Sequence, residues 1–581
     1  MNETVRKQIQ DHMVFIYGTD NAKPIADKLI RQLDKFSADH PQFLQTVNPN
    51  ERVTEADSIL ITYGDQVQEP GKSPLCTLSE VLATHLNGIV SSVHLLPFYP
   101  YSSDDGFSVM DYKAINPGWG DWDDVGLINE NFRLMFDAVI NHVSAKGVWF
   151  EKFLKDNPKY ANYFIVIDPG TDLSSVTRPR TSPLLTPFET PSGTKHVWTT
   201  FSADQVDINY ENPDVLLAII DVLLFYVSQG AEFIRLDAIA YMWKEIGSTC
   251  IHLPQVHRII QLFRTVLDGV APNVMLITET NVPHPENISY FGNGENEAQM
   301  VYNFSLPPLI LHTFHSGDAS VIQKWADNLE DLPDTATFFN FIASHDGIGV
   351  RPAEGLLSPA EIQNLCDKTV AHGGQVSYKN NSDGSQSPYE LNVTLFDALS
   401  NPNSEEPVEL QISRFIASQA IMLAMAGVPG IYVHSLVGSA NDHAGMKETG
   451  RARTINRQKW QRSDLEAALA EPESRANKVF QRYAELLKAR ASSPAFHPNG
   501  SQQIIGGNPA FFNLMRTSPD GQERVLCLHN ITDHAQYLEV DVSNLLQSDS
   551  ARELFTDKMV ILEGGVLRTT VEPYGVKWLA A

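Results

Sequence analysis

Short apolar runs recur along the chain as far as residue 433, and stretches with helical periodicity separate many of them. The runs are continuous rather than alternating, which is typical of strands buried on both faces in a parallel sheet. They are Ser58–Tyr63, Val93–Phe98, Phe136–Asn141, Phe233–Asp237, Val274–Glu279, Val301–Phe304, Phe338–Ser344 and Gly430–Val433. Helical patterns between them include Pro213–Ser228 and Leu253–Val270. This alternation predicts an α/β fold, a closed (β/α)8 TIM barrel.

Two long segments interrupt the alternation, residues 143–207 and residues 347–408. Loops of this length in a compact domain are usually lids or small inserted domains, and both leave the carboxyl ends of strands, where barrel active sites are built. Short alternating strands such as ERVLCLHNI then predict a C-terminal antiparallel β domain. The expected domains are a helical extension (1–55), the barrel (56–142, 208–346 and 409–500), two inserted domains (143–207 and 347–408) and the β domain (501–581).

Composition narrows the class of partner. The 581 residues include 43 basic and 70 acidic ones, a formal net charge of −27. Nucleic acid and anionic membranes require a basic surface, so we expect small-molecule partners. The four cysteines are far apart and predict free thiols. The charged start MNETVRKQIQDHMVFIYG lacks the apolar core of a signal peptide, so we expect a cytoplasmic protein.

Ionisable residues gather where the predicted strands end. The clusters are Asn141-His142, Arg235 with Asp237, Glu279, and His345-Asp346. A charge at the end of an apolar run costs free energy unless it is paired or used, so four clusters at successive strand ends predict a functional site. The alternative for His142 and His345 is a structural histidine with satisfied hydrogen bonds, and for Asp346 a turn residue before Gly347.

Asp237 and Glu279 have the properties of a glycosidase pair. Arg235 and Asp237 are two positions apart in a strand and point to the same face, so we expect the arginine to keep Asp237 ionised, as a nucleophile requires. Burial is expected to raise the pKa of Glu279, which suits a general acid. Carboxyl groups roughly 5 Å apart would imply a retaining mechanism through a glycosyl-enzyme.

Arg178 and Arg180 flank a proline in the first insertion of this acidic chain. Two guanidiniums held in this way predict a phosphate site, with a solvated or ion-paired loop as the alternative. We find no nucleotide-binding glycine motif in a strand–turn–helix context and no HExxH or CxxC motif.

Several segments resemble those of a known family. The stretches DAVINH (137–142), FIRLDAI (233–239), ITETN (277–281) and ASHDGIG (343–349) resemble the α-amylase superfamily, glycoside hydrolase family 13. Longer stretches resemble its sucrose phosphorylase subgroup, such as LITYGD (60–65), HLLPFYPYSSDDGFSVMDY (94–112), FSADQVDINY (201–210) and AGVPGIYV (426–433).

This resemblance implies a retaining α-glucoside phosphorylase. Asp237 resembles the nucleophile, Glu279 the general acid/base, and Asp346 the third carboxylate that holds sugar hydroxyls. Arg180 matches the lid arginine that receives phosphate. The implied sugar-site residues are Asp104, Phe107, His142, Phe201, Gln205, Arg235, His345 and Arg457. The family uses no metal or organic cofactor, and its partners are an α-glucoside, phosphate and α-glucose 1-phosphate; a homodimer is compatible with this assignment.

The extension of some 55 residues and the segment VRPAEGLLSPAEIQNL after Asp346 resemble the glucosylglycerate phosphorylases of this subgroup most. A glycerate carboxylate requires a cation, and the candidates are Arg178, Arg351 and Lys379. Sucrose, glucosylglycerol and sucrose 6′-phosphate remain alternative substrates. Two other classes are an α-glucosidase and an inactive sugar-binding protein.

Overall fold

The computed structural model describes residues 1–330, 332–381, 384–544, 546 and 548–581. Residues 331, 382–383, 545 and 547 lie outside the description, among them two residues of the second predicted insertion and two of the predicted C-terminal domain. Within the described part, no helix combines the length and apolar character that crossing a membrane requires.

Eight parallel strands close into a barrel, and they follow one another around it in chain order. They are β1 (Ile59–Thr62), β3 (Ser92–Leu95), β4 (Arg133–Ala138), β9 (Ala231–Leu236), β10 (Met275–Thr278), β11 (Met300–Tyr302), β12 (Thr337–Asn340) and β16 (Val428–Tyr432). Almost every strand residue is buried, as expected for strands between a packed interior and a helical layer. The TIM-barrel prediction is confirmed. The predicted runs continue beyond several strands; for example, residues 139–141 leave β4 as a loop that faces the barrel mouth.

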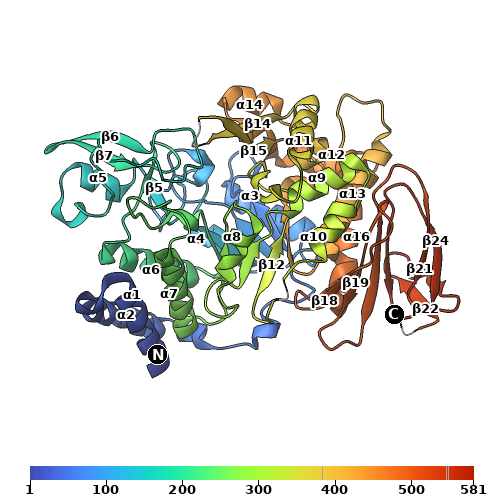
Figure 1. Ribbon diagram of the computed structural model, residues 1–581, viewed down its shortest axis with the longest axis horizontal. Coiled ribbons are helices and arrows are strands. Elements are labelled where there is room, and N and C mark those ends of the chain that lie inside the picture. Colours follow the sequence, from blue (N-terminus) through green and yellow to red (C-terminus); the bar gives the residue numbers. More distant parts are fainter. Residues whose placement is uncertain (331, 382–383, 545, 547) are drawn as a thin grey trace.

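Helices follow the strands on the outside of the barrel (Figure 1). They are α3 (Pro74–His85), α4 (Trp122–Asn129), α6 (Pro213–Ser228), α7 (Pro254–Val270), α8 (His284–Ile288), α9 (Leu306–Ser316), α10 (Ser320–Ala326), α13 (Val408–Ala424) and α16 (Arg475–Ala491). Local sequence explains where several begin: the side chains of Ser73, Asn212 and Ser474 cap α3, α6 and α16 by accepting hydrogen bonds from backbone N–H groups.

The first insertion leaves β4 and forms a small unit above one side of the barrel mouth. Its elements are β5 (His142–Ser144), α5 (Val148–Leu154), β6 (Leu185–Thr190), β7 (Gly193–Trp198) and β8 (Gln205–Asp207). The strands pair locally, β5 with β8 and β6 with β7, all antiparallel.

The second insertion follows β12. Its elements are β13 (Ile348–Gly349), α11 (Pro359–Ala371), β14 (Gln375–Asn380), β15 (Gln386–Asn392) and α12 (Leu395–Leu399). The three strands form an antiparallel sheet in the order β13-β15-β14, which we call the lid sheet. Figure 1 places it at the same end of the barrel as the first insertion.

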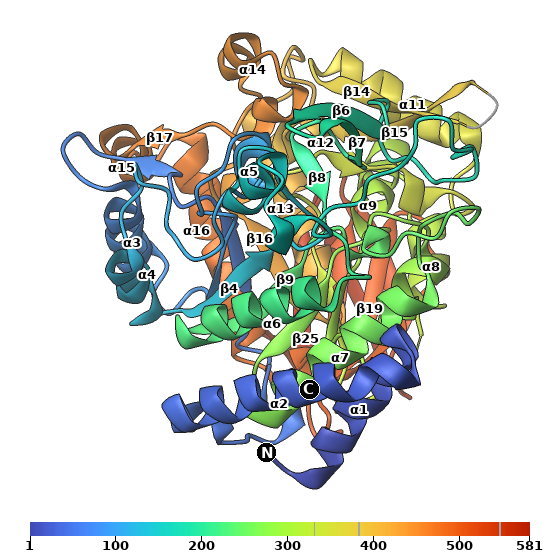
Figure 2. The same cartoon turned by 90° about the vertical axis from the view of Figure 1, so that its left-hand side faces the viewer.

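Two further units lie away from that end. The helices α1 (Glu3–Tyr17) and α2 (Thr19–Asp39) form a hairpin that crosses α6 and α7 (Figure 2), and the hydroxyl of Tyr17 donates a 2.9 Å hydrogen bond to the Tyr210 carbonyl.

The C-terminal strands form antiparallel sheets, as predicted. One contains β18 (Ser501–Ile504), β19 (Phe511–Thr517), β20 (Arg524–Asn530), β25 (Val576–Ala580), β22 (Ser550–Glu553) and β23 (Met559–Ile561); the other pairs β21 (Gln536–Asp541) with β24 (Val566–Val571).

Candidate active site

A pocket of roughly 990 Å³ opens at the carboxyl ends of the barrel strands, beneath both insertions. Strand ends that are far apart in sequence converge there, as in other TIM barrels. The structure brings together most of the sequence-predicted residues: the lining includes Asp104, Phe107, His142, Arg180, Phe201, Gln205, Asp237, Glu279, His345 and Asp346.

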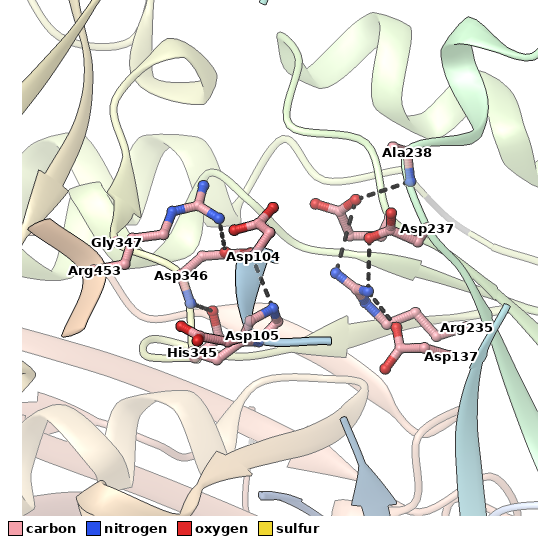
Figure 3. A network of polar contacts seen from close by, with 12 residues as sticks. Asp104, Asp105, Asp137, Arg235, Asp237, Ala238, His345, Asp346, Gly347 and Arg453 are labelled. Carbon is pink, nitrogen blue, oxygen red and sulfur yellow. Dashed lines mark hydrogen bonds and ion pairs between the residues drawn. The ribbon is translucent and has the colours of Figure 1, made fainter. Parts of the chain in front are cut away.

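Arg235 organises the floor of the pocket (Figure 3). The register of β9 against β4 sets Arg235 beside Asp137, and the two form a buried ion pair. Nη1 of Arg235 also donates a 2.9 Å hydrogen bond to Asp237, and its Nη2 lies 3.8 Å from Glu279. One guanidinium therefore contacts both carboxyl groups that the chemistry needs.

Asp137 was absent from the predicted site, although it begins the DAVINH segment. It is fully buried, and a 2.6 Å contact with His94 Nε2 completes its surroundings. The sequence analysis considered ionisable residues at the ends of predicted strands, and Asp137 lies inside one. Asp137 fixes the position of Arg235 and thereby that of Asp237.

The backbone immediately after Asp237 is strained. Ala238 has a φ of 49°, in the left-handed region that residues with a Cβ rarely adopt. This conformation directs its N–H toward Glu279, with a 3.2 Å hydrogen bond to Oε2. The turn thus links the two carboxylates.

Burial raises the pKa of both Asp237 and Glu279 to about 7. For Asp237, the charge of Arg235 opposes the rise, while Asp137 and Asp346 add to it. The expectation for Glu279 agrees with this direction. Arg235 lowers the pKa of Asp237 as expected, but burial and the neighbouring carboxylates outweigh that effect on this carboxyl group. Two interacting groups of this kind share one proton near neutral pH. Arg235 contacts Asp237 more closely than Glu279, so the shared proton lies on Glu279.

Asp346 is the third carboxylate of the pocket, and its environment lowers its pKa, whereas the pKa values of Asp237 and Glu279 are raised. Burial alone would raise its pKa, but Arg453 at 2.5 Å, His345 at 3.4 Å and Arg457 at 3.6 Å hold the pKa well below its usual range. An ionised carboxylate in a buried pocket is a strong acceptor for sugar hydroxyls.

Arg453 and Glu390 were missed by the sequence analysis. Glu390 on β15 is buried and contacts the Arg453 guanidinium at 3.0 Å, while its Oε1 accepts from the N–H of Gly347. Neither residue has a local signal, because each lies in a long insertion or loop whose path sequence periodicity does not predict. Together they tie the lid sheet to Asp346.

The remaining predicted sugar-site residues form one wall of the pocket. Gln205 donates to Asp104 at 3.2 Å, and His142 Nε2 lies 2.9 Å from the Phe107 carbonyl. The Phe107 ring stacks on His345 with centroids 4.9 Å apart. Burial lowers the pKa of both histidines, so they are neutral donors or acceptors. This wall combines polar groups for a sugar with an aromatic surface that excludes water.

The predicted cations are distributed unequally around the pocket. Arg180 lines it, with its guanidinium 5.4 Å from the centre of the Tyr389 ring. Arg178 is exposed and donates to the Ser182 carbonyl instead. Arg457 is buried, donates to the His345 carbonyl at 2.7 Å, and lines an adjoining hollow with Arg180. Arg351 and Lys379 are half-buried on the lid side, outside the lining.

The carboxyl groups and the cation of the pocket together indicate one type of reaction. Two carboxyl groups that share a proton, Asp237 and Glu279, face one cavity, Asp346 is ionised, and Arg180 adds a cation at the pocket wall. This arrangement suits acid-assisted glycosyl transfer through a covalent intermediate.

Comparison with known proteins agrees with this geometry. Residues 86–349 match the model of the α-amylase catalytic domain, and residues 507–578 match that of the maltogenic amylase C-terminal domain. The chain is 49% identical to the glucosylglycerate phosphorylase of Allomeiothermus silvanus, over 99% of this chain and 98% of the relative. It is 42% identical to that of Escherichia coli, over 99% and 100%.

Among solved structures, the chain is similar to the sucrose 6F-phosphate phosphorylase of Thermoanaerobacter thermosaccharolyticum. The TM-score is 0.72 at 24% sequence identity, and the match covers 91% of this chain and 99% of that one. At this identity the likeness shows a shared fold.

Proposed function

The chain belongs to the α-amylase family, glycoside hydrolase family 13, in the group that contains the glucosylglycerate and sucrose phosphorylases, and we propose that it is a glucosylglycerate phosphorylase. It transfers glucose from an α-glucoside to inorganic phosphate and releases α-glucose 1-phosphate.

The observation that best supports this chemistry is that one guanidinium, that of Arg235, contacts both Asp237 and Glu279. Asp237 attacks the anomeric carbon while Glu279 gives its proton to the oxygen of the leaving group. The bond to the acceptor breaks, and a β-glucosyl-enzyme forms on Asp237. Arg235 remains with the carboxylate that becomes an ester, and its hold on Asp137 keeps it in place.

In the second step phosphate takes the position that the leaving group has vacated. Glu279, now ionised, accepts the proton of the attacking phosphate oxygen, and the ester to Asp237 breaks with a second inversion. The product therefore retains the α configuration. Arg180 supplies charge for phosphate, since within the described residues no carboxylate forms an ion pair with it. The aromatic wall of Phe107 and Phe201 disfavours water as the competing acceptor.

Glycerate is the acceptor that the sequence relatives support. The relatives with 42% and 49% identity are both named glucosylglycerate phosphorylases. The segment after Asp346 also carries Arg351, whose charge acts on the pocket residue Tyr241, and a carboxylate acceptor needs such a cation.

The reverse reaction tests this function. Purified protein receives α-glucose 1-phosphate with D-glycerate, fructose, fructose 6-phosphate or glycerol, and phosphate release is followed. Fast release with glycerate alone is the expected result. Fast release with fructose would make the chain a sucrose phosphorylase. The same slow release with every acceptor, and with none, would mean hydrolysis and remove the phosphorylase assignment.

The cellular setting is part of the proposal. The four cysteines Cys76, Cys250, Cys366 and Cys527 are all free. Free thiols and a phosphorylated sugar product both suit the reducing cytoplasm. A homodimer stays a prediction, and light scattering of the purified protein measures it directly.

A further inference from the structure

Arg351 carries a charge that nothing in the described part of the chain neutralises. It begins the short turn Arg351–Ala353 directly after β13 and is half-buried. Its Nε is buried without a hydrogen-bond partner, and no described carboxylate forms an ion pair with its guanidinium. A cation withdrawn from water without a partner costs free energy, so its place calls for an anionic ligand.

A second unpaired cation lies beside it. Lys379 on β14 is half-buried, and its ammonium group has no hydrogen bond or ion pair among the described residues. Burial lowers the pKa of Lys379, and the charge of Arg351 lowers it further, so the two cations are neighbours. In a chain with a net charge of −27, these two cations gather positive charge at one place, and the charge of Glu354 opposes it only in part, since the pKa of Lys379 is still lowered.

Arg351 lies outside the pocket lining, but the backbone that leads to it packs against the pocket beside the general acid. Gly349 lines the pocket two residues before Arg351, and a Cβ there would lie 2.7 Å from Asn281 Nδ2. Asn281 follows the general acid by two positions and also lines the pocket, with a buried Oδ1 that has no partner. Since Glu279 protonates the leaving group, the residues that directly follow it border the space where that group sits.

The charges of both arginines, Arg351 and Arg180, reach the phenol of Tyr241. Tyr241 lines the pocket, and the charges of Arg351 and Arg180 both oppose the rise that burial causes in its pKa. The two guanidiniums therefore act on the same phenol from different segments, one from the turn after β13 and one from the first insertion. A pocket that receives phosphate and a second anion needs two such charges.

From this arrangement we infer that Arg351 selects the acceptor by binding its carboxylate, with Asn281 bonding an adjacent hydroxyl and Lys379 adding charge. The inference rests on the proposed function, because glycerate is the acceptor that carries a carboxylate. Arg351 is thus a specificity-determining residue. Arg180 serves phosphate and glucose 1-phosphate.

Glycerate and glycerol form a matched pair of acceptors, because glycerol is similar in size and lacks the carboxylate. In the reverse reaction, Arg351→Ala should lower kcat/KM for D-glycerate about tenfold to a hundredfold, mainly through KM, as expected for the loss of a charge-assisted hydrogen bond. In the same variant, kcat/KM for glycerol and the KM for α-glucose 1-phosphate should stay within about twofold of the wild-type values. Arg351→Lys, which keeps the charge, should recover part of the preference for glycerate.

Arg258→Ala is the control. That arginine is also half-buried but packs over Phe15 in the N-terminal hairpin, with 4.4 Å from its guanidinium carbon to the ring centre. Arg258→Ala should leave kcat/KM for glycerate and for glycerol unchanged.

Three results would overturn the inference: equal losses on glycerate and glycerol in Arg351→Ala, no loss on either, or a selective rise in the KM for phosphate. A wild-type enzyme that prefers fructose to glycerate would instead remove the proposed function, before any variant is compared. If Arg351→Ala does not fold, Arg351→Gln provides the same comparison with a side chain of similar length.

Discussion

Arg235 and Asp237 are two positions apart on one extended segment, and Nη1 of Arg235 donates a 2.9 Å hydrogen bond to Oδ1 of Asp237. Alternation along the strand places both side chains on the inner face of the barrel. The same guanidinium pairs with Asp137 behind it and approaches Glu279 in front. The proposed nucleophile and the proposed general acid are therefore held by one cation, which sets their relative protonation.

Replacing the nucleophile is expected to stop the reaction. Asp237→Asn keeps the size of the side chain but cannot form the glycosyl ester, so kcat should fall by at least about a thousandfold. Phosphate release from α-glucose 1-phosphate with glycerate measures it, alongside a circular dichroism spectrum as a folding control. Near-normal turnover would contradict the assignment of Asp237.

The barrel, its strand order and the residues at the strand ends follow from local sequence. Apolar runs identified the eight strands, and the charged residues that follow them identified Asp237, Glu279 and Asp346. Asp137 was not predicted, because it lies within an apolar run rather than directly after one. Glu390 and Arg453 were not predicted, because their contact depends on how the second insertion folds against the loop after β16, which periodicity does not encode.

The protonation of the carboxyl pair could not be read from sequence either. Arg235 suggested an ionised Asp237, but burial and the nearby charges of Asp137 and Asp346 raise its pKa, so its ionisation also depends on Glu279 holding the proton of the pair. Those charges come from other strands, so only the assembled barrel reveals the balance.

The shared proton predicts a bell-shaped pH dependence. Cleavage of the glucoside needs an ionised Asp237 and a protonated Glu279. Because the pKa of Glu279 is raised to about 7, the rate should fall as pH rises above about 7 and the pair loses its last proton. With α-glucosyl fluoride, which needs no acid, Glu279→Gln should keep more activity than with the natural substrate and should lack the alkaline fall. Equal losses with both donors would count against the acid role.

Arg180 and Arg178 offer a matched comparison on one loop. Arg180 lines the pocket, whereas Arg178 is exposed and bonded to the Ser182 carbonyl. Arg180→Ala should raise the KM for phosphate about tenfold or more and leave that for the glucoside less affected, as expected for losing a charged hydrogen bond. Arg178→Ala should raise the KM for phosphate less than Arg180→Ala does. Initial rates over a range of phosphate concentrations distinguish them, and an unchanged phosphate dependence in Arg180→Ala would refute its role.

Glu390 is expected to act through Arg453 on Asp346. Glu390→Gln removes the charge that holds Arg453, so Arg453 should position Asp346 less well and kcat/KM should fall about tenfold to a hundredfold. Asp367→Asn, an exposed change on α11 of the same insertion, is the control. An unaltered kcat/KM in Glu390→Gln would show that Asp346 keeps its place without this link.

The buried carboxyl pair should also limit stability at high pH. The folded state raises the pKa of Glu279 from 4.5 to about 7, so its contribution to stability is complete below about pH 4.5 and is lost as pH rises through 7. At pH 8 the wild type bears the cost of a buried charge, which Glu279→Gln avoids. We expect the variant to be more stable at pH 8, by on the order of 2–3 kcal/mol.

At pH 4.5 the difference between the two proteins should nearly vanish. Thermal unfolding of both at each pH measures this, and Glu485→Gln, an exposed change on α16, should show no such pH-dependent gain. A variant that is less stable than the wild type at pH 8 would mean that the hydrogen bond from Ala238 to the Glu279 carboxylate outweighs the cost of burying its charge.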